Sequence, residues 1–185
     1  GLDTSFTVMY LAKEKGYEVY AACANTGGFS EEQLKQNEEN AYKLGATKYV
    51  TIDVTKEYYE KSLKYMVFGN VLRNGTYPIS VSSERIFQAL AIARYANEIG
   101  ADAIAHGSTG AGNDQIRFEL GIKALAPDIK VIAPWRQDNW KMDSREAEIE
   151  YCKAHGIDLP FGTDSSYSRD RNIWHISHEG LELED

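Results

Sequence analysis

The chain has 185 residues, of which 43% are hydrophobic and 26% charged, and its formal net charge at pH 7 is −8. This length suits one domain with a buried core, or one domain and the start of another. The acidic balance argues against a general nucleic-acid surface, which needs a basic face, and no apolar run is long enough to cross a membrane.

The N-terminus lacks the basic and apolar regions of a signal peptide. The cysteines, Cys23 and Cys152, fall in a predicted strand and a predicted helix, as small core residues of a reduced protein would. We therefore expect a cytoplasmic protein that binds neither nucleic acid nor a membrane.

The chain begins with Gly1-Leu-Asp-Thr-Ser5, which runs directly into the amphipathic stretch Phe6–Lys15. Asp3, Thr4 and Ser5 are all favourable at the start of a helix, so a capped helix is one interpretation. A phosphate cradle in front of that helix is the other. Residues before Gly1 would be needed to choose between them.

A unit of helix, glycine and short apolar strand then recurs along the chain. Each glycine is typical of a helix C-terminus, and the rhythm is that of a parallel sheet covered by helices on both faces. A helix is also expected over 143–155. The fold class predicted is therefore α/β, with one twisted parallel sheet whose strands are 17–24, 48–53, 101–106 and 129–133.

Ligands of such sheets bind beyond the carboxyl ends of the strands, where Ala24–Gly28 and His106–Asn113 both lie. The segment His106–Glu119 is the most distinctive, because a glycine-rich turn leads into a helix that carries Asp114 and Arg117. The segment lacks the Lys and Ser/Thr of a Walker A loop. A carboxylate and a guanidinium so close together suit a zwitterionic amino acid, although an ordinary polar turn is the simpler alternative.

After Gly156 the repeated pattern of helix, glycine and strand is less clear. A hydroxyl-rich loop over 160–168 precedes Ile173–Ser177, which is expected to form an edge strand or the entry to a second domain. We therefore predict a nucleotide-binding domain over 1–160 and the start of a second domain over 161–185. Because no strand precedes the first helix, we expect a segment of a longer polypeptide whose sheet lacks its first strand.

These residues carry a family resemblance. The first five residues resemble the end of the Ser-Gly-Gly-x-Asp-Ser/Thr pyrophosphate loop of N-type ATP pyrophosphatases. The stretches Gly107–Glu119, Tyr77–Ser82 and Tyr167–Asp185 resemble argininosuccinate synthases in particular. The resemblance implies an adenine nucleotide alpha hydrolase-like, Rossmann-like fold.

In function, the resemblance implies a carbon–nitrogen ligase of arginine biosynthesis or the urea cycle. Such an enzyme condenses citrulline with aspartate through a citrulline-adenylate while ATP, accompanied by Mg²⁺, becomes AMP and pyrophosphate, and it works as a cytoplasmic homotetramer. No activated nucleophile is needed, because positioning and charge stabilisation carry the chemistry.

The resemblance also implies site residues, with no distinct catalytic side chain beyond positioning by Asn113, Asp114 and Arg117, and with metal ligands left unknown. ATP would be bound by Gly1, Leu2, Asp3, Thr4, Ser5, Ala24 and Gly107. Aspartate would be bound by Thr109, Asn113 and Asp114. Citrulline would be bound by Tyr77, Ser82, Asn113, Arg117, Ser168 and Ser177.

Simpler roles compete with several of these. Tyr77 could only anchor a turn before Pro78, Ser82 could cap the following helix, and Thr109 and Asn113 could be local turn formers. Two alternative functions stay open: another N-type ATP pyrophosphatase with a different acceptor, and a non-catalytic adenine-nucleotide-binding module.

Overall fold

The computed structural model describes residues 2–108, 112–136, 145–155, 168–180 and 183. Two parallel strand pairs form its centre. Strand β1 (Tyr20–Asn25) pairs with β2 (Lys48–Asp53), with Tyr20 opposite Lys48 and Asn25 opposite Asp53. Strand β5 (Ala103–Ala105) pairs with β6 (Lys130–Ile132). The four predicted strands therefore exist, and each pair is parallel as predicted.

The prediction that these strands form one sheet is wrong for the described residues. Strand β1 bonds only to β2, and β5 only to β6, so the described strands form separate pairs. Residues of β1 and β5 instead line one cavity of about 2140 Å³. A strand bonded to both would be needed to join the pairs, and no described segment supplies one. The glycine-stopped helices indicate parallel strands, but they do not indicate which strands are neighbours.

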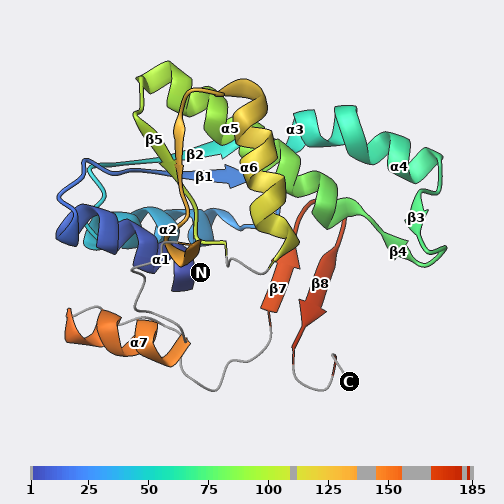
Figure 1. Cartoon of the computed structure of the whole chain (residues 1–185). Helices are drawn as coiled ribbons and strands as arrows, with labels where there is room; N and C mark the ends of the chain where they lie inside the picture. The colour runs from blue at the N-terminus through green and yellow to red at the C-terminus, as the bar shows by residue number, and fades with distance from the viewer. Residues whose placement is uncertain (1, 109–111, 137–144, 156–167, 181–182, 184–185) are drawn as a thin grey trace.

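Helices cover the strand pairs on both sides (Figure 1). Helix α1 (Leu2–Met9), continued by a π-helical turn over Tyr10–Glu14, lies with α2 (Glu31–Lys43) on one side of β1 and β2. Helix α5 (Ser80–Ile99) lies on the other side and packs against α6 (Asn113–Leu125). Helix α7 (Arg145–Ala154) packs against α1. This layering agrees with the predicted helices on both faces.

The helix ends follow their sequence signals. Ser30 caps α2 with a reciprocal capping box, in which Ser30 accepts from the backbone N–H of Gln33 and the Gln33 side chain accepts from the backbone N–H of Ser30. Gly100 ends α5 in the left-handed conformation, with φ of 67°. A residue with a Cβ would be strained there, which explains the glycine.

Smaller elements complete the described chain. Between β2 and α5 lie α3 (Thr55–Tyr58), a π-helical turn (Tyr59–Leu63), α4 (Lys64–Phe68), β3 (Leu72–Arg73) and β4 (Tyr77–Pro78). A 3₁₀ turn covers Pro134–Arg136. Toward the C-terminus, β7 (Ser168–Arg171) and β8 (Ile176–Glu179) form an antiparallel hairpin. The edge strand expected over 173–177 is therefore shifted toward the C-terminus.

The buried side chains of the described residues form separate clusters. Alanines of α5, including Ala89 and Ala93, pack with Ile104 and Ile122 in one buried cluster. Small side chains let α5 and α6 approach closely: a Cβ on Gly121 would lie 2.6 Å from the Cβ of Ala89. Phe6, Met9 and Leu44 form a second cluster with Cys152, which confirms that cysteine as a core residue.

Cys23 forms no disulfide and is only partly buried, whereas Cys152 is buried. Among the described helices, none is both long enough and apolar enough to cross a membrane.

Candidate functional site

The start of α1 and the loop after β5 meet at the cavity. Gly107 approaches α1 so closely that an added Cβ would lie 2.9 Å from Asp3 C and 2.9 Å from Thr4 N. Across this glycine, the ring Nδ1 of His106 accepts from the backbone N–H of Ser108 at 3.3 Å. The close approach of Gly107 to α1 brings together the segments predicted to hold the phosphates and the adenosine of ATP.

The first turn of α1 lines this cavity with Asp3, Thr4 and Ser5, whereas Leu2 is buried beneath it. The helix expected from these residues is thus present. Backbone N–H groups in the first turn of a helix have no intrahelical acceptor, and they attract anions. Gly1, which would complete a phosphate cradle, lies outside the described residues, so the choice between cap and cradle stays open.

The start of α6 supplies the charged side chains. Asn113, Asp114 and Arg117 all line the cavity, and α6 begins at Asn113 as the sequence predicts. Arg117 Nη1 donates to Asp114 Oδ1 at 2.7 Å. In the described structure, the group predicted to bind the aspartate ammonium and the group predicted to bind the citrulline carboxylate therefore bind each other.

Asp114 has a second cationic partner that the sequence analysis missed. Arg85 Nε donates to Asp114 Oδ2 at 3.0 Å, and Arg85 Nη2 donates to Asp170 Oδ1 at 2.7 Å. Burial alone would raise the pKa of Asp114, but Arg85 and Arg117 outweigh that effect and hold the pKa below its usual value. Asp114 is thus kept ionised, as a group that binds an ammonium must be.

Arg85 is itself well buried, with 13% of its side chain exposed. Burial favours the neutral form, yet Asp170 and Asp114 more than compensate and raise the pKa of Arg85 above its usual value. The sequence offered one indication that Arg85 belongs to the site. Arg85 follows Ser82 by three residues, so both lie on the same face of α5.

Tyr77 and Ser82 also line the cavity. Helix α5 begins at Ser80 and its N-cap position is Ile79, so Ser82 lies inside the first turn. The interpretation of Ser82 as the helix cap is therefore wrong, and its hydroxyl is available for a ligand. Tyr77 lies on β4, opposite Arg73 of β3, and is 42% exposed.

The remaining predicted residues are less well placed or cannot be placed. Ala24 lies near the end of β1, opposite Ile52, and is not among the described residues that line the cavity. Ser177 on β8 pairs in register with Asp170, and its buried Oγ has no hydrogen-bond partner within the described part of the chain. Ser168 is the first residue of β7, and Thr109 lies outside the described residues.

The arrangement puts the N-terminal end of α1 and a carboxylate–guanidinium pair on one cavity. Such a site can hold a polyphosphate at one end and the charged groups of amino acids at the other. Among the described residues, no group of three or more His, Cys, Asp or Glu side chains is placed to bind a metal ion.

Comparisons with known proteins identify the family of the chain. A family model described as "Arginosuccinate synthase N-terminal HUP domain" matches residues 1–158, which supports the Rossmann-like class of the fold. The chain is 57% identical over 185 residues to the argininosuccinate synthase of Agathobacter rectalis. It is 52% identical over 185 residues to that of Lachnospira eligens, and 52% identical over 186 residues to that of Lachnoclostridium phytofermentans.

In each of these comparisons the whole chain is matched, but it spans 45% of the relative's length. The family model covers most of the chain, including the cavity residues of α1, α5 and α6. The chain therefore belongs to the argininosuccinate synthase family.

Proposed function

We propose that the protein condenses citrulline with aspartate to form argininosuccinate, with ATP converted to AMP and pyrophosphate. The observation that carries this proposal is the Asp114–Arg117 pair at the start of α6, which shares a cavity with the first turn of α1. A pair of opposite charges fits two amino-acid substrates, and the N-terminal end of a helix fits the phosphates of ATP.

In the first step of the proposed reaction, the ureido oxygen of citrulline attacks the α-phosphorus of ATP. A new oxygen–phosphorus bond forms, and the bond to the β-phosphate breaks to release pyrophosphate. The start of α1, with Asp3, Thr4 and Ser5, would hold the β- and γ-phosphates, and Gly107 would leave room for the adenosine. Gly1, Leu2 and Ala24 are the remaining residues proposed for ATP.

In the second step, the amine of aspartate attacks the activated ureido carbon, and the carbon–oxygen bond to AMP breaks. Asp114 would bind the aspartate ammonium and orient it, and the ammonium would lose a proton to solvent before its nitrogen attacks. Arg117 would bind the citrulline carboxylate, and Asn113 would contact both substrates. Thr109 is proposed for aspartate, and Tyr77, Ser82, Ser168 and Ser177 for citrulline.

These roles are positioning roles, so the rate enhancement would come from holding the reactants together and stabilising charge. Mg²⁺ would enter with ATP as part of the substrate, because it prefers hard oxygen ligands such as those of a polyphosphate. We also infer that the full-length protein is a cytoplasmic homotetramer. Light scattering of the purified full-length protein tests the assembly, and a mass of fewer than four chains would contradict it.

The proposed chemistry predicts where an isotope label goes. Citrulline labelled with ¹⁸O in its ureido group is incubated with ATP, aspartate and the full-length protein. We expect the label in AMP, because the ureido oxygen stays on the α-phosphorus when the carbon–oxygen bond breaks. Mass spectrometry of the purified AMP and pyrophosphate measures it.

Three other results would contradict the proposal. Label in pyrophosphate would place the attack on another phosphorus atom. AMP formed without need of citrulline or aspartate would indicate an ATP pyrophosphatase with a different acceptor. Nucleotide binding with no release of pyrophosphate would indicate a binding module.

A further inference from the structure

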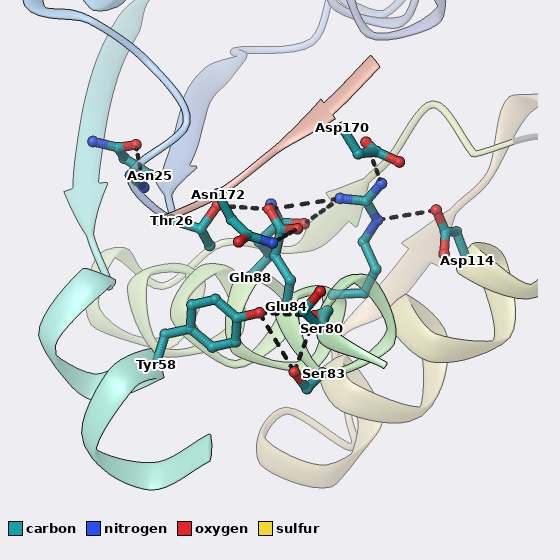
Figure 2. A network of polar contacts seen from close by, with 12 residues as sticks. Asn25, Thr26, Tyr58, Ser80, Ser83, Glu84, Gln88, Asp114, Asp170 and Asn172 are labelled. Atoms are coloured by element: carbon teal, nitrogen blue, oxygen red, sulfur yellow. Dashed lines mark hydrogen bonds and ion pairs between the residues drawn. The ribbon is translucent and has the colours of Figure 1, made fainter. Parts of the chain in front are cut away.

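Glu84 on α5 is a buried carboxylate to which the reaction assigns no role. The residue is 2% exposed, and both of its carboxylate oxygens accept hydrogen bonds. The Thr26 hydroxyl donates to Oε1 at 2.6 Å, and the Asn172 side-chain amide donates to Oε2 at 3.0 Å. Both oxygens of this carboxylate therefore act as hydrogen-bond acceptors. Figure 2 shows Glu84 with Thr26 and Asn172 beside its carboxylate.

Two partners from α5 itself support the same group. Gln88 Nε2 donates to Glu84 Oε1 at 3.0 Å, and Arg85 Nη1 lies 3.8 Å from that oxygen. The buried carboxylate therefore has hydrogen-bond donors and a guanidinium close by, as buried acidic side chains in proteins usually do.

The partners of Glu84 belong to segments far apart in the sequence. Thr26 lies in the loop after β1, directly beyond Ala24 and Asn25, and Asn172 lies in the turn between β7 and β8. The same segments also touch directly: the Ile173 N–H donates to the Thr26 carbonyl at 2.9 Å. A Cβ at Gly27 would overlap the Ile173 side chain, so this loop and the hairpin turn are in tight contact.

The turn itself depends on Asn172. Its side-chain Oδ1 accepts from Trp174 N at 2.9 Å and from His175 N at 3.2 Å, while its amide nitrogen binds Glu84. The amide cannot flip without losing all three bonds. Glu84 therefore fixes the orientation of Asn172, and Asn172 fixes the turn that leads into β8 and Ser177.

We propose that Glu84 is a positioning residue that joins the loop after β1 to the β7–β8 hairpin and so fixes the nucleotide side and the citrulline side of the site relative to each other. Naming the two sides rests on the proposed function. The connection between loop and hairpin through Glu84, called the joint below, rests on the contacts above. Arg85, the next residue on α5, binds the same hairpin through Asp170 and also binds Asp114. Glu84 and Arg85 thus connect the hairpin to the loop after β1 and to Asp114, respectively.

An exchange of donor and acceptor tests the joint. In Glu84→Gln the new amide nitrogen opposes another donor in either orientation, the Asn172 amide nitrogen on one side or Gln88 Nε2 on the other. In Asn172→Asp two carboxylates would face each other. In the double variant Glu84→Gln/Asn172→Asp, the amide introduced at position 84 can donate to the carboxylate introduced at position 172. The amide oxygen at position 84 still accepts from Thr26, and the new carboxylate still accepts from Trp174 and His175.

Hydrogen exchange measured by mass spectrometry on the full-length protein gives the first readout. We expect each single variant to raise exchange at the backbone amides of residues 173–175 by about tenfold or more, the usual effect of losing a hydrogen bond to a charged group. The double variant should return exchange close to that of the unmodified protein. Glu57→Gln is the matched control, since Glu57 on α3 binds Lys61 and Arg94 rather than the hairpin, and it should leave these amides unchanged.

Steady-state kinetics gives the second readout. The single variants should raise KM for ATP and for citrulline together, and the double variant should lower both again. Two results would overturn the proposal that Glu84 joins the loop to the hairpin. In the first, the amides of residues 173–175 exchange as fast in the double variant as in the single variants. In the second, they exchange as slowly in the single variants as in the unmodified protein. If Glu84→Gln does not fold, Thr26→Val removes only the loop-side bond, and unchanged exchange at residue 173 would overturn the joint equally.

The two proposals can fail separately. If the unmodified protein does not adenylate citrulline, the proposed function fails, and hydrogen exchange still decides the joint. If the label from citrulline reaches AMP but the double variant does not restore slow hydrogen exchange, the positioning role of Glu84 is wrong and the proposed function stands.

Discussion

Asp114→Asn in the full-length protein should weaken aspartate binding by about 2–5 kcal/mol, or roughly 30-fold to several thousand-fold in KM for aspartate. The reason is that the substrate ammonium would enter the cavity and meet a neutral amide, while Arg85 and Arg117 would remain without their shared carboxylate. KM for ATP should change little, because the start of α1 and Gly107 do not depend on this carboxylate. Steady-state kinetics with each substrate varied in turn measures the difference.

Asp128→Asn is the matched control, since Asp128 is exposed in the loop after α6, and its kinetics should match the unmodified protein. Thermal unfolding of both variants separates a loss of stability from a loss of binding. An equal rise in KM for ATP and aspartate in Asp114→Asn would contradict the assignment and would indicate that the loop before α6 holds phosphate.

The local elements of this fold could be predicted because their signals are local. Strand β2 has the predicted bounds of 48–53, and α6 begins at the predicted Asn113. Gly16, Gly45 and Gly100 each have positive φ where the chain leaves a helix. A backbone conformation that favours glycine marks a helix end without reference to anything distant in the sequence.

The arrangement of strands could not be predicted in the same way. Hydrophobic pattern and glycine stops indicate that a strand is parallel and buried, and they carry no information on its neighbour. The prediction placed 17–24 and 101–106 in one sheet, whereas residues of β1 and β5 line a shared cavity without bonding to each other. Neighbour relations depend on contacts between distant segments.

In the candidate site, residues close together in the sequence were predicted, and residues far apart in the sequence were missed. Asn113, Asp114 and Arg117 were predicted together because they occupy less than two turns of one helix, and they do line the cavity together. Arg85 and Asp170 were missed because their bond joins residues 85 apart in the chain. A charged pair such as Glu84-Arg85 on a helix is most often solvent-exposed, so its burial here could be found only from the structure.

The structure also changes how the citrulline assignment should be tested. Arg117 Nη1 binds Asp114 Oδ1 at 2.7 Å, so a change at Arg117 is expected to reach the aspartate subsite as well. Asp114 keeps its bond to Arg85 when Arg117 is altered, which limits that effect. The two substrates should therefore respond unequally rather than independently.

Arg117→Lys in the full-length protein should raise KM for citrulline by about ten- to a hundredfold, because lysine keeps the charge but cannot offer the planar pair of donors that a carboxylate accepts. KM for aspartate should rise by a smaller factor, and KM for ATP should stay nearly unchanged. Arg94→Lys is the matched control, since Arg94 lies on α5, is half exposed and binds Glu57, and it should leave all three KM values unchanged. A larger rise for aspartate than for citrulline would show that Arg117 acts mainly through Asp114, and the citrulline carboxylate would then have to be bound by another cation.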